Sequence, residues 1–177
     1  MAETILTNGM TSTGITIAKG EILKVSAGAL VSESLVSGGS VQVFDQGKAE
    51  NNTMSAGGTM TISSGGSADG NIVSSAGQMW VLDGATANIV AVNSGGALYG
   101  WGTVKDATVY HSGTFMAISG TVSGTVIDSG GSMEVSAGVN VSDTEILNGG
   151  LLEQYGGVTD KTVVSSGGRM EFGLTTL

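Results

Sequence analysis

The chain has 177 residues and a net charge of −9, with 31 glycines and neither proline nor cysteine. A hydrophobic content of 40% argues against intrinsic disorder, and abundant glycine without proline fits neither collagen nor a proline-rich linker. The acidic surplus leaves no basic patch for phosphates, so we expect no nucleic-acid partner. No apolar run approaches the ~20 residues of a membrane-spanning helix, so we expect no membrane insertion of this segment.

The first segment, residues 1–14, lacks the basic start and apolar block of a signal peptide. We expect it to form a partial N-terminal coil or a cap. Residues 15–177 are expected to form one continuous repeat domain. If the protein is exported, we expect its targeting segment to lie outside this sequence.

From residue 15 onward the sequence repeats itself at a short and nearly constant interval. The last glycine of each repeated turn, which we call the marker glycine, recurs after 17 to 19 residues. The marker glycines are Gly20, Gly39, Gly58, Gly77, Gly96, Gly113, Gly131, Gly150 and Gly168. Repeats this short cannot hold a pair of helices, but they match one coil of a parallel β-helix with a rise of ~4.8 Å per coil.

Each marker glycine is followed by alternating apolar and mixed positions, the pattern of a half-buried strand. The residue two places after the marker is large and apolar in all nine repeats: Ile22, Val41, Met60, Met79, Leu98, Phe115, Met133, Leu152 and Met170. We interpret this column as a core stack in which methionine fills gaps, and we expect no metal or cofactor there.

A second apolar column lies four places before the marker glycine. Its members are Thr16, Leu35, Met54, Val73, Val92, Val109, Ile127, Ile146 and Val164. Ile15 and Ile17, on either side of the polar Thr16, indicate a small register shift in the first repeat.

A further glycine follows six to eight residues after each of the first eight markers. We assign both glycines to turns because glycine adopts positive φ without steric cost. Each repeat is then a strand, a turn, a strand, a turn and a return segment. The predicted fold is an all-β, single-stranded parallel β-helix of about nine coils of 18–19 residues.

The repeats resemble those of a known family. The residues that carry the likeness are "VNSGGALYG" at 92–100, "VIDSGGSMEVSAG" at 126–138, "ILNGGLLEQYGG" at 146–157 and "TVVSSGGRMEF" at 162–172. Over residues 15–173 the pattern resembles the passengers of AIDA-type autotransporters, surface adhesins and self-associating antigens of Gram-negative bacteria.

The resemblance implies a right-handed β-helix, an extracellular location at the cell surface, and a non-catalytic role. The segment is expected to be a piece of a longer passenger that associates with itself or with host or neighbouring cells. The resemblance also implies an alternative role as a scaffold whose serines or threonines accept heptose from a heptosyltransferase.

The outward column three places after the marker glycine is the candidate contact site. If coils stack in register, Trp80, Tyr99 and Met116 form a contiguous apolar patch, and such patches often mark contacts. Glu134, Glu153 and Glu171 continue the same column. Two alternatives stay open at this stage: these glutamates bridge a cation or point into water, and the patch faces a partner or is covered by a loop.

The serine-rich turns are the candidate glycosylation sites. Ser37, Ser94, Ser129 and Ser166 lie two residues before marker glycines. The alternative is that their hydroxyls cap tight turns.

A catalytic role, such as glycan processing on a β-helix, needs a cluster of reactive groups. The single histidine, His111, lies at the same turn position as the serines and has no nucleophile at a suitable spacing. We therefore interpret His111 as a turn residue and expect no enzymatic activity.

Overall fold

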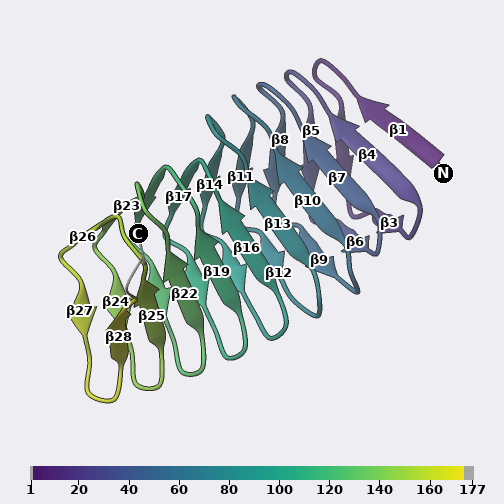
Figure 1. The fold of residues 1–177 in the computed structure, drawn as a ribbon. Helices are drawn as coiled ribbons and strands as arrows, with labels where there is room; N and C mark the ends of the chain where they lie inside the picture. The colour runs from purple at the N-terminus through teal and green to yellow at the C-terminus, as the bar shows by residue number, and fades with distance from the viewer. Residues whose placement is uncertain (1, 174–177) are drawn as a thin grey trace.

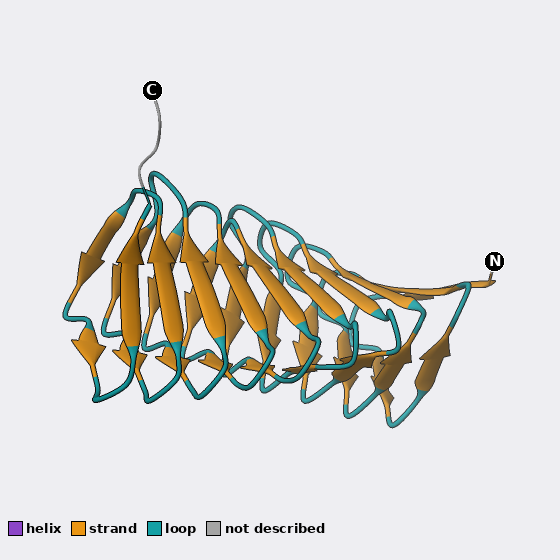
Figure 2. Cartoon of the chain, turned by 60° about the horizontal axis from the view of Figure 1, so that its bottom comes forward, coloured by secondary structure: helices purple, strands orange, loops and turns teal. Residues whose placement is uncertain are grey.

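The computed structural model describes residues 2–173, and every regular element in that range is a β-strand. The strands form an elongated solenoid of three parallel sheets (Figures 1 and 2). In Figure 1 the near strands run upward and the chain returns behind them as it advances from right to left. This is the right-handed winding that parallel crossovers strongly favour.

Each sheet takes one strand from every coil, and neighbours in a sheet are equivalent strands of successive coils. The first sheet contains β1 (Ala2–Leu6), β4 (Glu21–Val25), β7 (Ser40–Val43), β10 (Thr59–Ile62), β13 (Gln78–Val81), β16 (Ala97–Gly100), β19 (Thr114–Ala117), β22 (Ser132–Val135), β25 (Leu151–Gln154) and β28 (Arg169–Phe172). The second contains β2 (Thr11–Thr13), β5 (Leu30–Ser32), β8 (Lys48–Glu50), β11 (Ser67–Asp69), β14 (Thr86–Asn88), β17 (Thr103–Lys105), β20 (Thr121–Ser123), β23 (Asn140–Ser142) and β26 (Val158–Asp160). The third contains β3 (Thr16–Ala18), β6 (Leu35–Ser37), β9 (Thr53–Ser55), β12 (Ile72–Val73), β15 (Ala91–Val92), β18 (Thr108–Val109), β21 (Val126–Ile127), β24 (Glu145–Ile146) and β27 (Val163–Val164).

This architecture confirms the all-β parallel solenoid of about nine coils. The third sheet adds a detail to it, because the expected return segment is itself a short strand. In β12, for example, Val73 is fully buried and pairs with Met54 of the preceding coil and Val92 of the next. Within the described residues, no helix is long and apolar enough to cross a membrane.

The core consists of the predicted columns stacked along the solenoid axis. In the middle coils the residues two after the marker glycine are completely inaccessible: Val41, Met60, Met79, Leu98, Phe115, Met133 and Leu152. Met60 pairs directly with Met79, and Met79 with Leu98. The methionine stack is therefore core, as the alternation predicted.

The predicted register is wrong in β4, the strand that follows the first marker glycine, Gly20. Leu23, not Ile22, is buried, because β4 pairs Leu23 with Val41. The residue after it, Lys24, consequently faces outward, where its Nζ lies 2.8 Å from the carboxylate of Glu3.

The second apolar column is also shifted in the early coils. Val36 is buried whereas Leu35 is 40% exposed, since the turn before Gly39 is one residue shorter than its later equivalents. Ile17 fills the column in place of Thr16, in line with the predicted shift.

At the other end, Met170 is only half-buried and Val164 is 46% exposed. Both occupy their predicted positions in register with Leu152 and Ile146. Their exposure follows because no described coil lies over them.

The two glycines of a marker turn are needed for different reasons. Gly95 has a φ of 71°, the left-handed region that favours glycine. At Gly96, however, a Cβ atom would overlap the carbonyl oxygen of Val73 in the preceding coil. Positive φ therefore explains the first glycine, whereas close coil packing explains the marker glycine itself.

Candidate contact site

The predicted outward column exists as one continuous line on the first sheet. Trp80 pairs with Tyr99, Tyr99 with Met116, and Met116 with Glu134. The line continues through Glu153 and Glu171. All six side chains are half-buried, because each is flanked by the equivalent side chain of the neighbouring coil.

The aromatic side chains in this line stack on one another. The ring centroids of Trp80 and Tyr99 are 6.0 Å apart with an interplanar angle of 26°. Those of Tyr99 and Trp101 are 6.4 Å apart at 29°. Because the ring faces are turned toward each other, the ring edges are what the sheet presents to its surroundings.

Another outward column of apolar side chains, which the sequence reasoning missed, lies beside Trp80, Tyr99 and Met116. It consists of Leu82, Trp101 and Ile118, each of which follows a strand of the first sheet. Their backbone N–H groups donate to Ile62, Val81 and Gly100, so the ladder of hydrogen bonds continues one residue past the strand ends. All three lie five places after a marker glycine, so one further step of the alternation would have found them.

Together the two columns form a compact apolar array, which we call the contact face. It comprises Trp80, Leu82, Tyr99, Trp101, Met116 and Ile118. In Figure 1 strands β13, β16 and β19 form the near side of the solenoid, with no described segment in front of them. The alternative of a covering loop is therefore not supported for residues 2–173.

The three glutamates at the end of the column have different surroundings. The hydroxyl of Tyr155 donates to Glu153 at 3.2 Å, and Arg169 pairs with Glu171. The negative charge of Glu153, its hydrogen bond to Tyr155 and desolvation raise the pKa of Tyr155, and the charge of Glu134 adds to the effect.

A cation bridge between the glutamates has no preformed site. Within residues 2–173 no three His, Cys, Asp or Glu side chains are grouped so that they could hold a metal ion.

Three of the four candidate serines share one position. Ser94, Ser129 and Ser166 are exposed at the tips of equivalent turns. Ser37 is different, because it ends strand β6, is half-buried and pairs with Ser55. The expected equivalence of Ser37 is thus wrong, for the same reason that the register slips at Leu35.

His111 is an exposed turn residue, aligned with Ser94 and Ser129 through the hydrogen bonds of the neighbouring turn residues. A Cβ atom at Gly130 would overlap the imidazole of His111, so the ring of His111 lies over the equivalent turn of the next coil. This placement agrees with the structural interpretation of His111.

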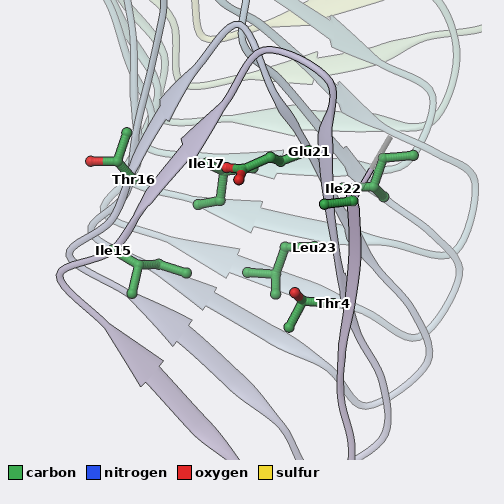
Figure 3. A pocket seen from close by; sticks show the side chains of 8 residues that line it. Thr4, Ile15, Thr16, Ile17, Glu21, Ile22 and Leu23 are labelled. Carbon is green, nitrogen blue, oxygen red and sulfur yellow. The ribbon is translucent and has the colours of Figure 1, made fainter.

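A hollow of about 180 Å³ opens at the N-terminal end of the core, away from the contact face (Figure 3). Strands β1, β3 and β4 line it with mainly apolar side chains, including Ile17 and Leu23, and Ile15, which directly precedes β3, completes it. Glu21 is its titratable group, and the carboxylate already accepts a hydrogen bond from the N–H of Ala18 at 2.8 Å. We interpret the hollow as the open end of the core.

Comparison with known proteins gives a family match for part of the chain and a solved structure with a similar fold. Residues 43–96 match the family AIDA, described as an adhesin of the bacterial autotransporter system and probable stalk. The crystal structure of a TibC-catalyzed hyper-glycosylated TibA fragment is similar, with a TM-score of 0.55 and 24% identity over 98% of this chain and 85% of that chain. At this identity the likeness concerns the fold. Comparison with curated protein sequences found no significant match. The match at residues 43–96 agrees with the resemblance seen along the repeats.

Proposed function

We propose that this chain is a non-catalytic stalk segment of a bacterial cell-surface adhesin of the autotransporter type. The observation that carries the proposal is the AIDA match at residues 43–96. The same coil continues in register on both sides of that segment, from β1 to β28. The working location is the outside of a Gram-negative cell, where a rigid solenoid holds binding surfaces away from the membrane.

The contact face is the part of the stalk that we assign to association with a sister copy or with neighbouring or host cells. Its support is chemical, because a contiguous array of six large apolar side chains on the outer side of a sheet is typical of an interaction surface. Trp and Tyr are also the residues that most often dominate binding energy in such surfaces.

Display of the chain on a non-adherent Gram-negative strain, by fusion to a translocator, tests this proposal. The displayed wild type is expected to make cells settle or adhere, and Trp80→Ser combined with Tyr99→Ser is expected to abolish the effect. The matched control, Tyr110→Ser, removes an aromatic residue that is 41% exposed next to the third sheet. Equal settling of all displayed variants would place adhesion elsewhere.

A second role, as an acceptor of O-linked heptose, is supported by the three equivalent exposed serines Ser94, Ser129 and Ser166. The TibA fragment with the similar fold is itself hyper-glycosylated. Co-expression with a heptosyltransferase and intact-mass spectrometry tests this role. The expected result is a set of heptose additions that decreases when the three serines are changed to alanine, and an unmodified mass would contradict it.

A further inference from the structure

The contact face borders directly on an acidic stretch of the same sheet. The first sheet holds two basic residues in its described strands, Lys24 and Arg169, and each is paired with a glutamate. In contrast, Glu134 and Glu153 have no basic partner in any described ion pair. The apolar array therefore continues into a region of uncompensated negative charge.

The acidic stretch is unfavourable for the isolated protein. Glu134, Glu153 and Glu171 are aligned in register on successive coils, where side chains of like charge stand about 5 Å apart and repel. A cationic group placed against them would remove this repulsion. The face is thus complementary to a ligand with an apolar part followed by a basic part.

The spacing of the rungs indicates the form of such a ligand. Side chains on the contact face repeat every ~4.8 Å along the axis. An α-helix presents side chains on one face at intervals of ~5.4 Å, whereas an extended strand presents them every ~6.7 Å. Over three rungs a helix therefore stays within about 1 Å of register, and a strand departs by nearly 4 Å.

We propose that the contact face binds a cationic amphipathic α-helix lying along the solenoid axis. Its apolar side chains pack on Trp80, Tyr99, Trp101 and their neighbours, and its lysine or arginine side chains reach Glu134 and Glu153. This inference rests on the proposed role of the contact face. A second copy of the chain fits less well, because each copy carries a net charge of −9 and would bring further acidic surface.

Fluorescence anisotropy with a defined probe tests the proposal. The probe is an 18-residue labelled helical peptide with leucines and a tryptophan on one face of its first half and lysines on that face of its second half. The matched probe carries glutamate in place of each lysine. The wild type is expected to bind the lysine probe at low salt and to lose affinity as salt is added, and to leave the glutamate probe unbound.

Two variants separate the apolar and the charged contributions. Tyr99→Ser should weaken binding at least ~10-fold, because central aromatic residues dominate such interfaces. Glu134→Gln with Glu153→Gln should weaken binding and flatten its salt dependence, and it removes a repulsion, so the fold is retained. Glu145→Gln, which removes an exposed carboxylate from β24 of the third sheet, should leave binding unchanged.

Equal binding of the two probes, or equal loss with Glu145→Gln, would overturn the proposal. The proposal would also be overturned if the wild-type protein did not bind the lysine probe while settling of displayed cells still depended on Tyr99. That last result would keep the adhesive role and assign the face to a second copy. Loss of probe binding without loss of settling would instead refute the adhesive role of the face and keep the helix site.

Discussion

Asn52 and Asn71 occupy the same corner of successive coils, and the side-chain amide of Asn52 donates to Oδ1 of Asn71 at 3.1 Å. The backbone N–H of Asn52 donates to the same oxygen at 2.9 Å. Oδ1 of Asn52 in turn accepts from the N–H of Ser34, and its amide also reaches the carbonyl of Val31. Both asparagines are 0% exposed, so they form a satisfied polar ladder inside the solenoid.

Replacing Asn52 with alanine should leave several buried polar groups of this ladder without hydrogen-bond partners. We expect a loss of about 3 kcal/mol in the free energy of unfolding, measured by urea denaturation. The control is Asn140→Ala on the exposed side of β23, which should change stability by less than ~0.5 kcal/mol. If both variants lose the same stability, the internal hydrogen bonds contribute nothing specific.

Further along the same corner column the polar groups lack partners. The hydroxyls of Thr125, Thr144 and Thr162 are buried without a hydrogen bond in the described structure. Val90 occupies the equivalent place in an earlier coil, so valine fits there. Thr144→Val should therefore raise the free energy of unfolding by about 1 kcal/mol, because an unpaired buried hydroxyl is removed. The control is Thr103→Val on the outer side of β17. A lower free energy of unfolding for Thr144→Val than for this control would refute the assignment of Thr144 as an unpaired, destabilising hydroxyl.

The marker turns predict a difference between two alanine substitutions. Gly57 has a φ of 78° and open space where the Cβ atom of an alanine would lie, so Gly57→Ala should cost about 1–2 kcal/mol from backbone strain alone. Gly96→Ala involves no positive φ but places a Cβ atom in overlap with the Val73 carbonyl, and it should destabilise by more, about 3 kcal/mol or above. Thermal unfolding followed by circular dichroism orders the two, and a greater loss at Gly57 would contradict the packing explanation.

Tyr155 should titrate above the usual range of tyrosine. Its pKa is raised because the charge and hydrogen bond of Glu153 favour the protonated phenol. The stabilising interaction is thus fully present below the unfolded tyrosine pKa and is lost as pH rises through the folded pKa. Carbon-13 NMR of labelled tyrosines should show the Tyr155 titration moving to lower pH in Glu153→Gln. An unchanged titration would exclude Glu153 as the cause.

The alternation of apolar and polar residues was sufficient to predict the middle coils. Met60, Met79 and Met133 are buried because the turn between the third and first sheets has the same length from Met54 onward, which keeps every rung in register. The prediction failed at Leu35, where the turn before Gly39 is one residue shorter, and at Ile22, because Gly20 lies one residue earlier relative to the buried Leu23 than the later marker glycines do. A shift by one residue exchanges the two faces of a strand, so such errors affect whole rungs.

The contact face and the internal ladder show two further limits of sequence reasoning. Trp101 was missed because it follows a strand, although its backbone still pairs with the preceding coil. Asn52 was missed because a polar residue in a turn is usually exposed. Here Asn51, with a φ of 55°, redirects the chain so that the next side chain points inward.

The stacking of equivalent residues can be tested with single thiols, since the sequence contains no cysteine. Met60→Cys and Thr61→Cys place a thiol on adjacent residues of β10, the first fully buried and the second on the outer surface. Maleimide labelling followed by mass spectrometry should modify Thr61→Cys in native buffer and Met60→Cys only after unfolding in denaturant. Equal labelling rates for the two folded variants would contradict the register on which the core and the contact face both depend.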